Sequence, residues 1–159
     1  MSYKKILAAL DNSPLGKAVF KHASEMAKQN QASLMLLHCL TIDEQSMTPY
    51  TSIYQGEFSS SSYLFREKLE TQTKEVDQWL GDYCKMATEQ GISTEWDWKV
   101  GEPSRWIRDV AKGWDADLIV MGRRGLKGIS EMFLGSVSNY IVHHSPCSVL
   151  IIQGESLDD

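Results

Sequence analysis

The sequence lacks several features that would assign it to a common class. No apolar run approaches the roughly 20 residues that span a bilayer, which argues against a helical membrane protein. The three cysteines are scattered and form no C-x-x-C pair, which argues against disulfides and a structural zinc site. The phosphate-binding patterns G-x4-G-K-[S/T] and G-x-G-x-x-G are both absent. These absences leave an ordinary globular protein as the expectation.

Positive charge is also scarce. The 16 lysine and arginine residues are outnumbered by 21 aspartate and glutamate residues, which gives a net charge of −5. No long basic stripe offsets this balance, so we expect no nucleic-acid partner. The basic residues that stand beside glycines are better explained as local phosphate partners: Arg123, Arg124 and Lys127. Residues 1–6 lead into a strand-like segment without an apolar leader, so we expect a cytoplasmic protein with no membrane partner.

What the sequence does contain is an alternation of strand-like and helix-like segments. Its 159 residues suit a single domain, 1–159, with one sizeable core. Continuous apolar runs, typical of strands buried on both faces, occupy 6–10, 34–40, 117–120 and 148–152. A fifth segment, 94–100, alternates apolar and charged residues as edge strands do. Helical spacing predicts helices from near Pro14, Phe65, Pro103 and Gly135. This pattern predicts an α/β fold with an open, parallel five-stranded sheet and helices on both faces.

Two segments lack this periodicity. Residues 41–62 contain proline, glycine and a run of four serines, which predicts a flexible loop. This loop is either a lid over a ligand or locally disordered, and Tyr50, Tyr54 and Phe58 would stack on a base in the first case. Residues 154–159 form an acidic tail that we expect to be frayed.

The most informative stretch, residues 121–136, joins the fourth predicted strand to the last predicted helix. Its glycines follow the pattern G-x2-G-x9-G-[S/T] from Gly122 to Ser136. Gly122 and Gly125 have no Cβ, so their backbone can approach a ligand closely. Gly135 and Ser136 open the helix, where free N–H groups and the positive end of the helix dipole attract phosphate. The stretch therefore predicts a site for an anionic ligand.

This spacing, with its flanks, resembles the nucleotide-binding signature of the universal stress protein family. The resemblance covers almost the whole chain, through matching segments at 4–11, 36–39, 100–103 and 145–152. It implies the strand order 3-2-1-4-5, with the alternating third strand at an edge. In that order the winding reverses between the first and fourth strands, and open α/β sheets bind ligands beyond the carboxyl ends of such strands. Asp11 and the glycine stretch are therefore expected to be neighbours.

The resemblance also implies a ligand and its contacts. The expected ligand is an adenine nucleotide, ATP or AMP, and a magnesium ion (Mg) beside ATP is left open. The expected contacts are Asp11, Cys39, Met121, Gly122, Arg124, Gly125, Gly135, Ser136, Val137 and Ser138. Asp11 would accept hydrogen bonds from ribose hydroxyls, cap the following helix, or do both. Cys39 would meet adenine through its backbone, and Met121 would pack on the base. Ala9 stands where some relatives carry proline, which changes the expected wall around the base.

The predicted function is that of an adenine-nucleotide-binding protein in stress response or signalling. Two alternatives stay open: a slow ATP hydrolase, with Glu131 as a weak candidate base, and an interaction module whose glycine stretch is empty. We assign no catalytic residue and no metal site. The last strand has no lysine or proline to guard its edge, so we expect a homodimer through Val149, Leu150, Ile151 and Ile152.

Overall fold

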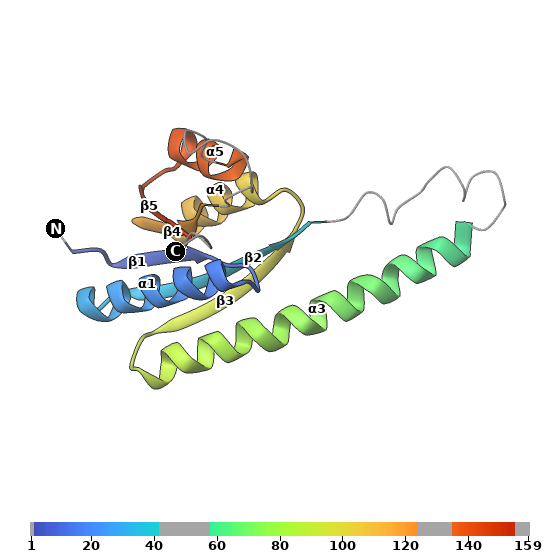
Figure 1. Cartoon of the computed structure of the whole chain (residues 1–159), viewed down its shortest axis with the longest axis horizontal. Coiled ribbons are helices and arrows are strands. Elements are labelled where there is room, and N and C mark those ends of the chain that lie inside the picture. Colours follow the sequence, from blue (N-terminus) through green and yellow to red (C-terminus); the bar gives the residue numbers. More distant parts are fainter. Residues whose placement is uncertain (1, 42–57, 124–134, 155–159) are drawn as a thin grey trace.

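The computed structural model describes residues 2–41, 58–123 and 135–154. Its centre is a sheet of five parallel strands (Figure 1). In chain order they are β1 Lys5–Ala9, β2 Ser33–Leu40, β3 Thr94–Val100, β4 Leu118–Gly122 and β5 Ser148–Ile152. Their order in the sheet is β3-β2-β1-β4-β5, which confirms the predicted order and the edge position of β3.

Helices cover both faces of this sheet. In the described residues they are α1 Pro14–Asn30, α3 Phe58–Glu89, α4 Pro103–Trp114 and α5 Ser136–His144. α1 and α3 pack on one face and α4 and α5 on the other, as Figure 1 shows. The predicted α/β architecture is therefore confirmed. None of the helices in the described part of the chain is both long enough and apolar enough to cross a membrane.

One boundary differs from the prediction, because α3 begins early. The sequence predicts a loop over 41–62 and a helix from Phe65, whereas the helix starts at Phe58 and includes the last five residues of the predicted loop. The serines at 59–62 have a helix propensity only moderately below that of alanine, so they prolong a helix that later residues stabilise by packing. The amino-terminal part of α3 reaches beyond the sheet (Figure 1). The rest of the predicted loop, 42–57 with its two tyrosines, lies outside the described residues, as do 155–159 of the tail.

The sheet lies between two hydrophobic clusters, because successive side chains of a strand point to opposite faces. Ile6 and Ala8 of β1 pack with α1 and α3, whereas Leu7 packs with α4 and α5. These three side chains are fully buried, as are Ile119 and Val120 of β4. Burial on both faces explains why the central strands have continuous apolar sequences.

β1 and β4 are neighbours in the sheet, but the helices that follow them lie on opposite faces. α1 leads from β1 to β2 on one face, and α5 leads from β4 to β5 on the other. The register pairs Leu7 with Ile119 and Ala8 with Val120, so the two strands run side by side to the same edge. The winding reverses between them, and the residues that follow Ala9 and Gly122 meet at this edge.

Candidate functional site

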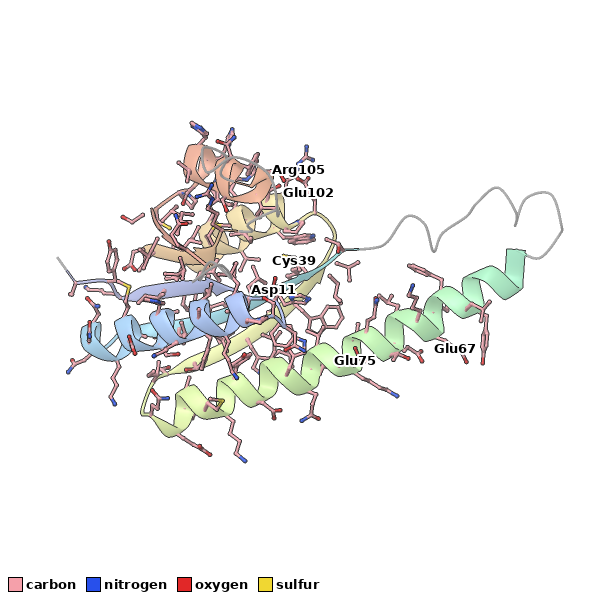
Figure 2. The ribbon with its side chains drawn as sticks, in the orientation of Figure 1. Asp11, Cys39, Glu67, Glu75, Glu102 and Arg105 are labelled. Carbon is pink, nitrogen blue, oxygen red and sulfur yellow. The ribbon has the colours of Figure 1, made fainter. Side chains whose placement is uncertain are left out.

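A pocket of about 280 Å³ opens at this edge, beyond the carboxyl ends of β1, β2 and β4. Eight predicted ligand contacts line it: Asp11, Cys39, Met121, Gly122, Gly135, Ser136, Val137 and Ser138. Figure 2 labels Asp11 and Cys39, which lie close together in that view. Arg124 and Gly125 lie outside the described residues, as does Glu131. The structure thus gathers in one place every predicted contact that it describes.

Asp11 lies in the turn between β1 and α1. The hydroxyl of Ser13 donates a hydrogen bond to the Asp11 carboxylate. The Oγ atom of Ser13 also accepts a hydrogen bond from the backbone N–H of Gly16 at 3.1 Å. Ser13 is therefore the N-cap of α1, and Pro14 occupies the first turn, where its missing N–H is not needed. Asp11 supports the cap through Ser13 and is not the cap itself. Its carboxylate belongs to the pocket wall.

α5 begins at the pocket, with Gly135 as its N-cap and Ser136 as its first residue. The first N–H groups of a helix have no partner within the helix, and together with the positive end of the helix dipole they attract anions. Ser138 is buried, and its hydroxyl donates a long hydrogen bond of 3.4 Å to the carbonyl oxygen of Gly122. This bond connects the first turn of α5 to the end of β4. A phosphate is the group that suits this part of the pocket.

Gly122 has a role that the motif does not reveal. A Cβ on Gly122 would lie 2.7 Å from Cγ of Leu15 and 2.8 Å from Cδ2 of the same side chain. The missing Cβ therefore makes room for a side chain of α1. Gly122 lines the pocket beside Leu15, so the two segments that carry the predicted contacts touch each other here.

Other walls of the pocket are apolar. Burial raises the pKa of the Cys39 thiol to about 12, so this thiol stays protonated at neutral pH. Met121 of β4 and Ile107 of α4 also line the pocket, and each is only 4% exposed. A neutral thiol beside two buried aliphatic side chains offers a contact surface for a planar, weakly polar group such as a nucleobase.

Comparison with known proteins assigns the family. Residues 2–153 match the model of the universal stress protein family. A universal stress protein of Synechocystis sp. is 49% identical over 153 residues, which cover 96% of this chain and 99% of that protein. This chain belongs to the universal stress protein family. The resemblance inferred from the motifs is confirmed.

Solved structures of universal stress proteins share the fold. UspA from Lactobacillus plantarum matches with a TM-score of 0.73 at 24% identity, over 96% of this chain and 99% of that one. A universal stress protein in complex with cAMP matches with a TM-score of 0.63 at 22% identity, over 96% and 98% of the two chains. One from Archaeoglobus fulgidus in complex with dAMP has a TM-score of 0.59 at 22% identity, over 96% and 99%. At these identities the likeness shows the fold alone.

The pocket of this universal stress protein has further walls that the motifs did not reveal. They include Leu15 and Gly16 of α1, His38 of β2 and Pro103 of α4. A Cβ on Gly16 would lie 2.0 Å from the backbone oxygen of Asp11 and 2.7 Å from its Oδ1, so a larger residue does not fit there without a shift. A glycine in the first turn of a helix was a visible signal for this contact. Pro103 reaches the pocket through the packing of α4, which no local motif specifies.

Proposed function

We propose that this universal stress protein binds an adenine nucleotide in the pocket between β1 and β4. The observation that carries the proposal is the convergence of three kinds of group on one cavity. These are the Asp11 carboxylate, the N-terminus of α5, and an apolar wall that includes Met121. They suit a ribose, a phosphate and a base respectively. Two structural neighbours, in complex with cAMP and dAMP, support the same class of ligand.

Each contact has a physical role in this proposal. The carboxylate of Asp11 accepts hydrogen bonds from ribose hydroxyls. The backbone N–H groups of the first turn of α5 bind phosphate oxygens. The backbone of Cys39 and the side chain of Met121 contact adenine. Arg124 and Gly125 complete the contacts with ribose and phosphate.

The same pocket suits ATP and AMP, and a magnesium ion would accompany ATP through its phosphates. Among the described residues, no group of three or more histidine, cysteine, aspartate or glutamate side chains is arranged to hold a metal ion.

No observation favours the hydrolase alternative. Of the described residues that line the pocket, only Asp11 carries a carboxylate, and Ser13 donates a hydrogen bond to it. We therefore propose a cytoplasmic binding protein that acts in stress response or signalling.

Thermal unfolding with ATP, ADP and AMP tests the proposal. At a nucleotide concentration 100 times the dissociation constant, binding to the native state stabilises it by roughly 2.7 kcal/mol. For a chain of this size that raises the thermal midpoint by about 5–10 °C. In this proposal the Ser136 hydroxyl is a further donor to the phosphate, so Ser136→Ala should weaken binding by roughly 1.5–3 kcal/mol, the value of a hydrogen bond to a charged group.

The matched control is Ser93→Ala, because Ser93 is an exposed serine just before β3, at the opposite edge of the sheet. This variant should respond to nucleotide like the wild type. An unchanged wild-type midpoint with all three nucleotides at millimolar concentration would remove the proposal. Equal responses of the wild type and Ser136→Ala would show that the Ser136 hydroxyl does not contact the ligand.

We also infer a two-fold homodimer through β5. In the described sheet β5 is an edge strand that pairs only with β4. Its residues Val149, Leu150 and Ile151 are half-buried, and Ile152 is buried. An exposed apolar edge without lysine or proline invites pairing with another strand. Pairing β5 with its copy about a two-fold axis covers both edges at once.

A further inference from the structure

The backbone just before Asp11 is held by β2. The N–H of Leu10 donates to the carbonyl oxygen of Leu37 at 2.8 Å. The carbonyl oxygen of Leu10 lies 2.7 Å from Nδ1 of His38. A carbonyl oxygen only accepts, so Nδ1 carries the proton and donates in this pair. Both backbone groups of Leu10 are therefore bonded to successive residues of β2.

Packing holds the His38 ring in this orientation. The ring meets the indole of Trp79, from α3, nearly at a right angle, with centroids 4.9 Å apart and an interplanar angle of 77°. Trp79 is itself partly buried against the hydrophobic cluster on this face of the sheet. His38 lines the pocket, and its imidazole is held by a hydrogen bond and by an aromatic neighbour. Its bond to Leu10 is therefore a fixed feature of the pocket.

This hydrogen bond acts on Asp11 through the peptide unit. The unit is planar, so the carbonyl group of Leu10 lies in one plane with the nitrogen and Cα of Asp11. Anchoring that oxygen restricts the direction in which the Asp11 side chain leaves the backbone. On the other side of Asp11, Ser13 donates to the carboxylate and Gly16 packs against it. The carboxylate is thus aimed by its neighbours on both sides along the chain.

We propose that His38 is a positioning residue for Asp11, and that it sets the preference of the pocket for ribose over 2′-deoxyribose. The inference rests on the proposed nucleotide site. A carboxylate recognises a hydroxyl only at an oxygen–oxygen distance of about 2.5–3.0 Å, so a small rotation at Asp11 loses the bond to the 2′-hydroxyl. The phosphate contacts come from α5 and the base contact of Met121 comes from β4, so these stay in place. His38 therefore controls recognition of the sugar.

Two amide variants separate the hydrogen bond from the other contacts of the ring. Asparagine carries its amide nitrogen as many bonds from Cα as Nδ1, whereas glutamine carries it one bond further out. His38→Asn therefore keeps a donor for Leu10 and His38→Gln loses it, while both lose the ring contact with Trp79. Calorimetric titration of the full chain with AMP and with 2′-deoxy-AMP gives the ratio of the two dissociation constants.

The expected ratio follows from the strength of a hydrogen bond to a carboxylate. Wild type and His38→Asn should bind AMP about tenfold or more tightly than 2′-deoxy-AMP, and in His38→Gln this ratio should fall below about 3. His38→Gln should lose more affinity for AMP than for 2′-deoxy-AMP. A wild-type ratio in His38→Gln would overturn the inference. So would an equal loss of affinity for both nucleotides, because general structural damage has that effect.

Two further measurements complete the test. If His38→Gln does not fold, His38→Phe replaces it as a variant that keeps an aromatic ring and lacks the donor. Long-range ¹H–¹⁵N spectra of the wild type report the tautomer without any ligand, and an unprotonated Nδ1 would overturn the inference. Equal affinity of the wild type for AMP and 2′-deoxy-AMP would remove the inference and leave the nucleotide site standing. Binding of neither would remove both.

Discussion

Gly16→Ala should destabilise this protein, although the same change stabilises most helices. Alanine is favoured over glycine inside a helix by up to about 1 kcal/mol. At Gly16, however, the added Cβ would lie 2.0 Å from the backbone oxygen of Asp11 and 2.7 Å from its Oδ1. A backbone oxygen cannot rotate away as a flexible side chain does, so the turn between β1 and α1 has to shift. Overpacking of this kind typically costs about 1–3 kcal/mol, and we expect a net loss of stability of that size.

Two other helical glycines provide matched controls. At Gly81 in α3 and Gly113 in α4, none of the described residues beyond the adjoining helix backbone comes within 4 Å of the position that a Cβ would take. Gly81→Ala and Gly113→Ala should therefore raise the free energy of unfolding by about 0.5–1 kcal/mol. The free energy of unfolding should thus fall in Gly16→Ala and rise in both controls. Urea unfolding followed by far-UV circular dichroism measures all three variants against the wild type.

The same variants test the link between Gly16 and the pocket. Displacement of Asp11 should weaken AMP binding in Gly16→Ala, while Gly81→Ala should bind AMP like the wild type. A Gly16→Ala variant as stable as the controls would show that the turn yields without cost, and the steric argument would then be wrong. A destabilised variant with normal AMP affinity would argue against Asp11 as a contact of the ligand.

Two further predictions concern the Cys39 thiol and the β5 edge of the sheet. Burial raises the pKa of Cys39 from 9.0 to about 12, so the unfolded chain releases this proton at lower pH than the folded protein. The contribution of this thiol to the free energy of unfolding is complete below pH 9.0 and is lost as the pH rises toward about 12. The loss is at most about 1.4 kcal/mol per pH unit. In urea unfolding, the free energy of unfolding of Cys39→Ala should fall less steeply above pH 9.0 than that of the wild type. An equal fall in both proteins would show that Cys39 is not its cause. Ile151→Lys should give a monomer in analytical sedimentation because it places a charge on the β5 edge; a wild type already monomeric at micromolar concentration would refute the dimer.

The order of the elements could be predicted from the sequence because it depends on local patterns. The run at 6–10 is apolar without alternation because β1 is buried on both faces, whereas β3 alternates because it lies at an edge. The start of α3 could not be predicted in the same way. Serines at 59–62 are common in loops and are also tolerated in helices, so local preference does not place the boundary there.

The pocket could be predicted only in part. Asp11 and Gly122 follow neighbouring parallel strands, so their meeting at one edge follows from the strand order. Pro103 and Ile107 enter the pocket from α4, and their place depends on how that helix crosses the sheet. His38 stands in a matching segment, but its bond to the backbone before Asp11 appears only once β1 and β2 are in register.

Gly122 connects the α1 side of the pocket to the α5 side. On one side its missing Cβ admits Leu15 of α1, whose Cγ would lie 2.7 Å from such an atom. On the other side its carbonyl oxygen accepts a hydrogen bond from Ser138, in the first turn of α5. One residue at the end of β4 therefore contacts both the helix that follows Asp11 and the helix whose N-terminus suits phosphate. These two contacts connect α1 to α5 through the end of β4. In the proposed site, these contacts lower the entropy cost of ordering Asp11 and the start of α5 when a nucleotide binds.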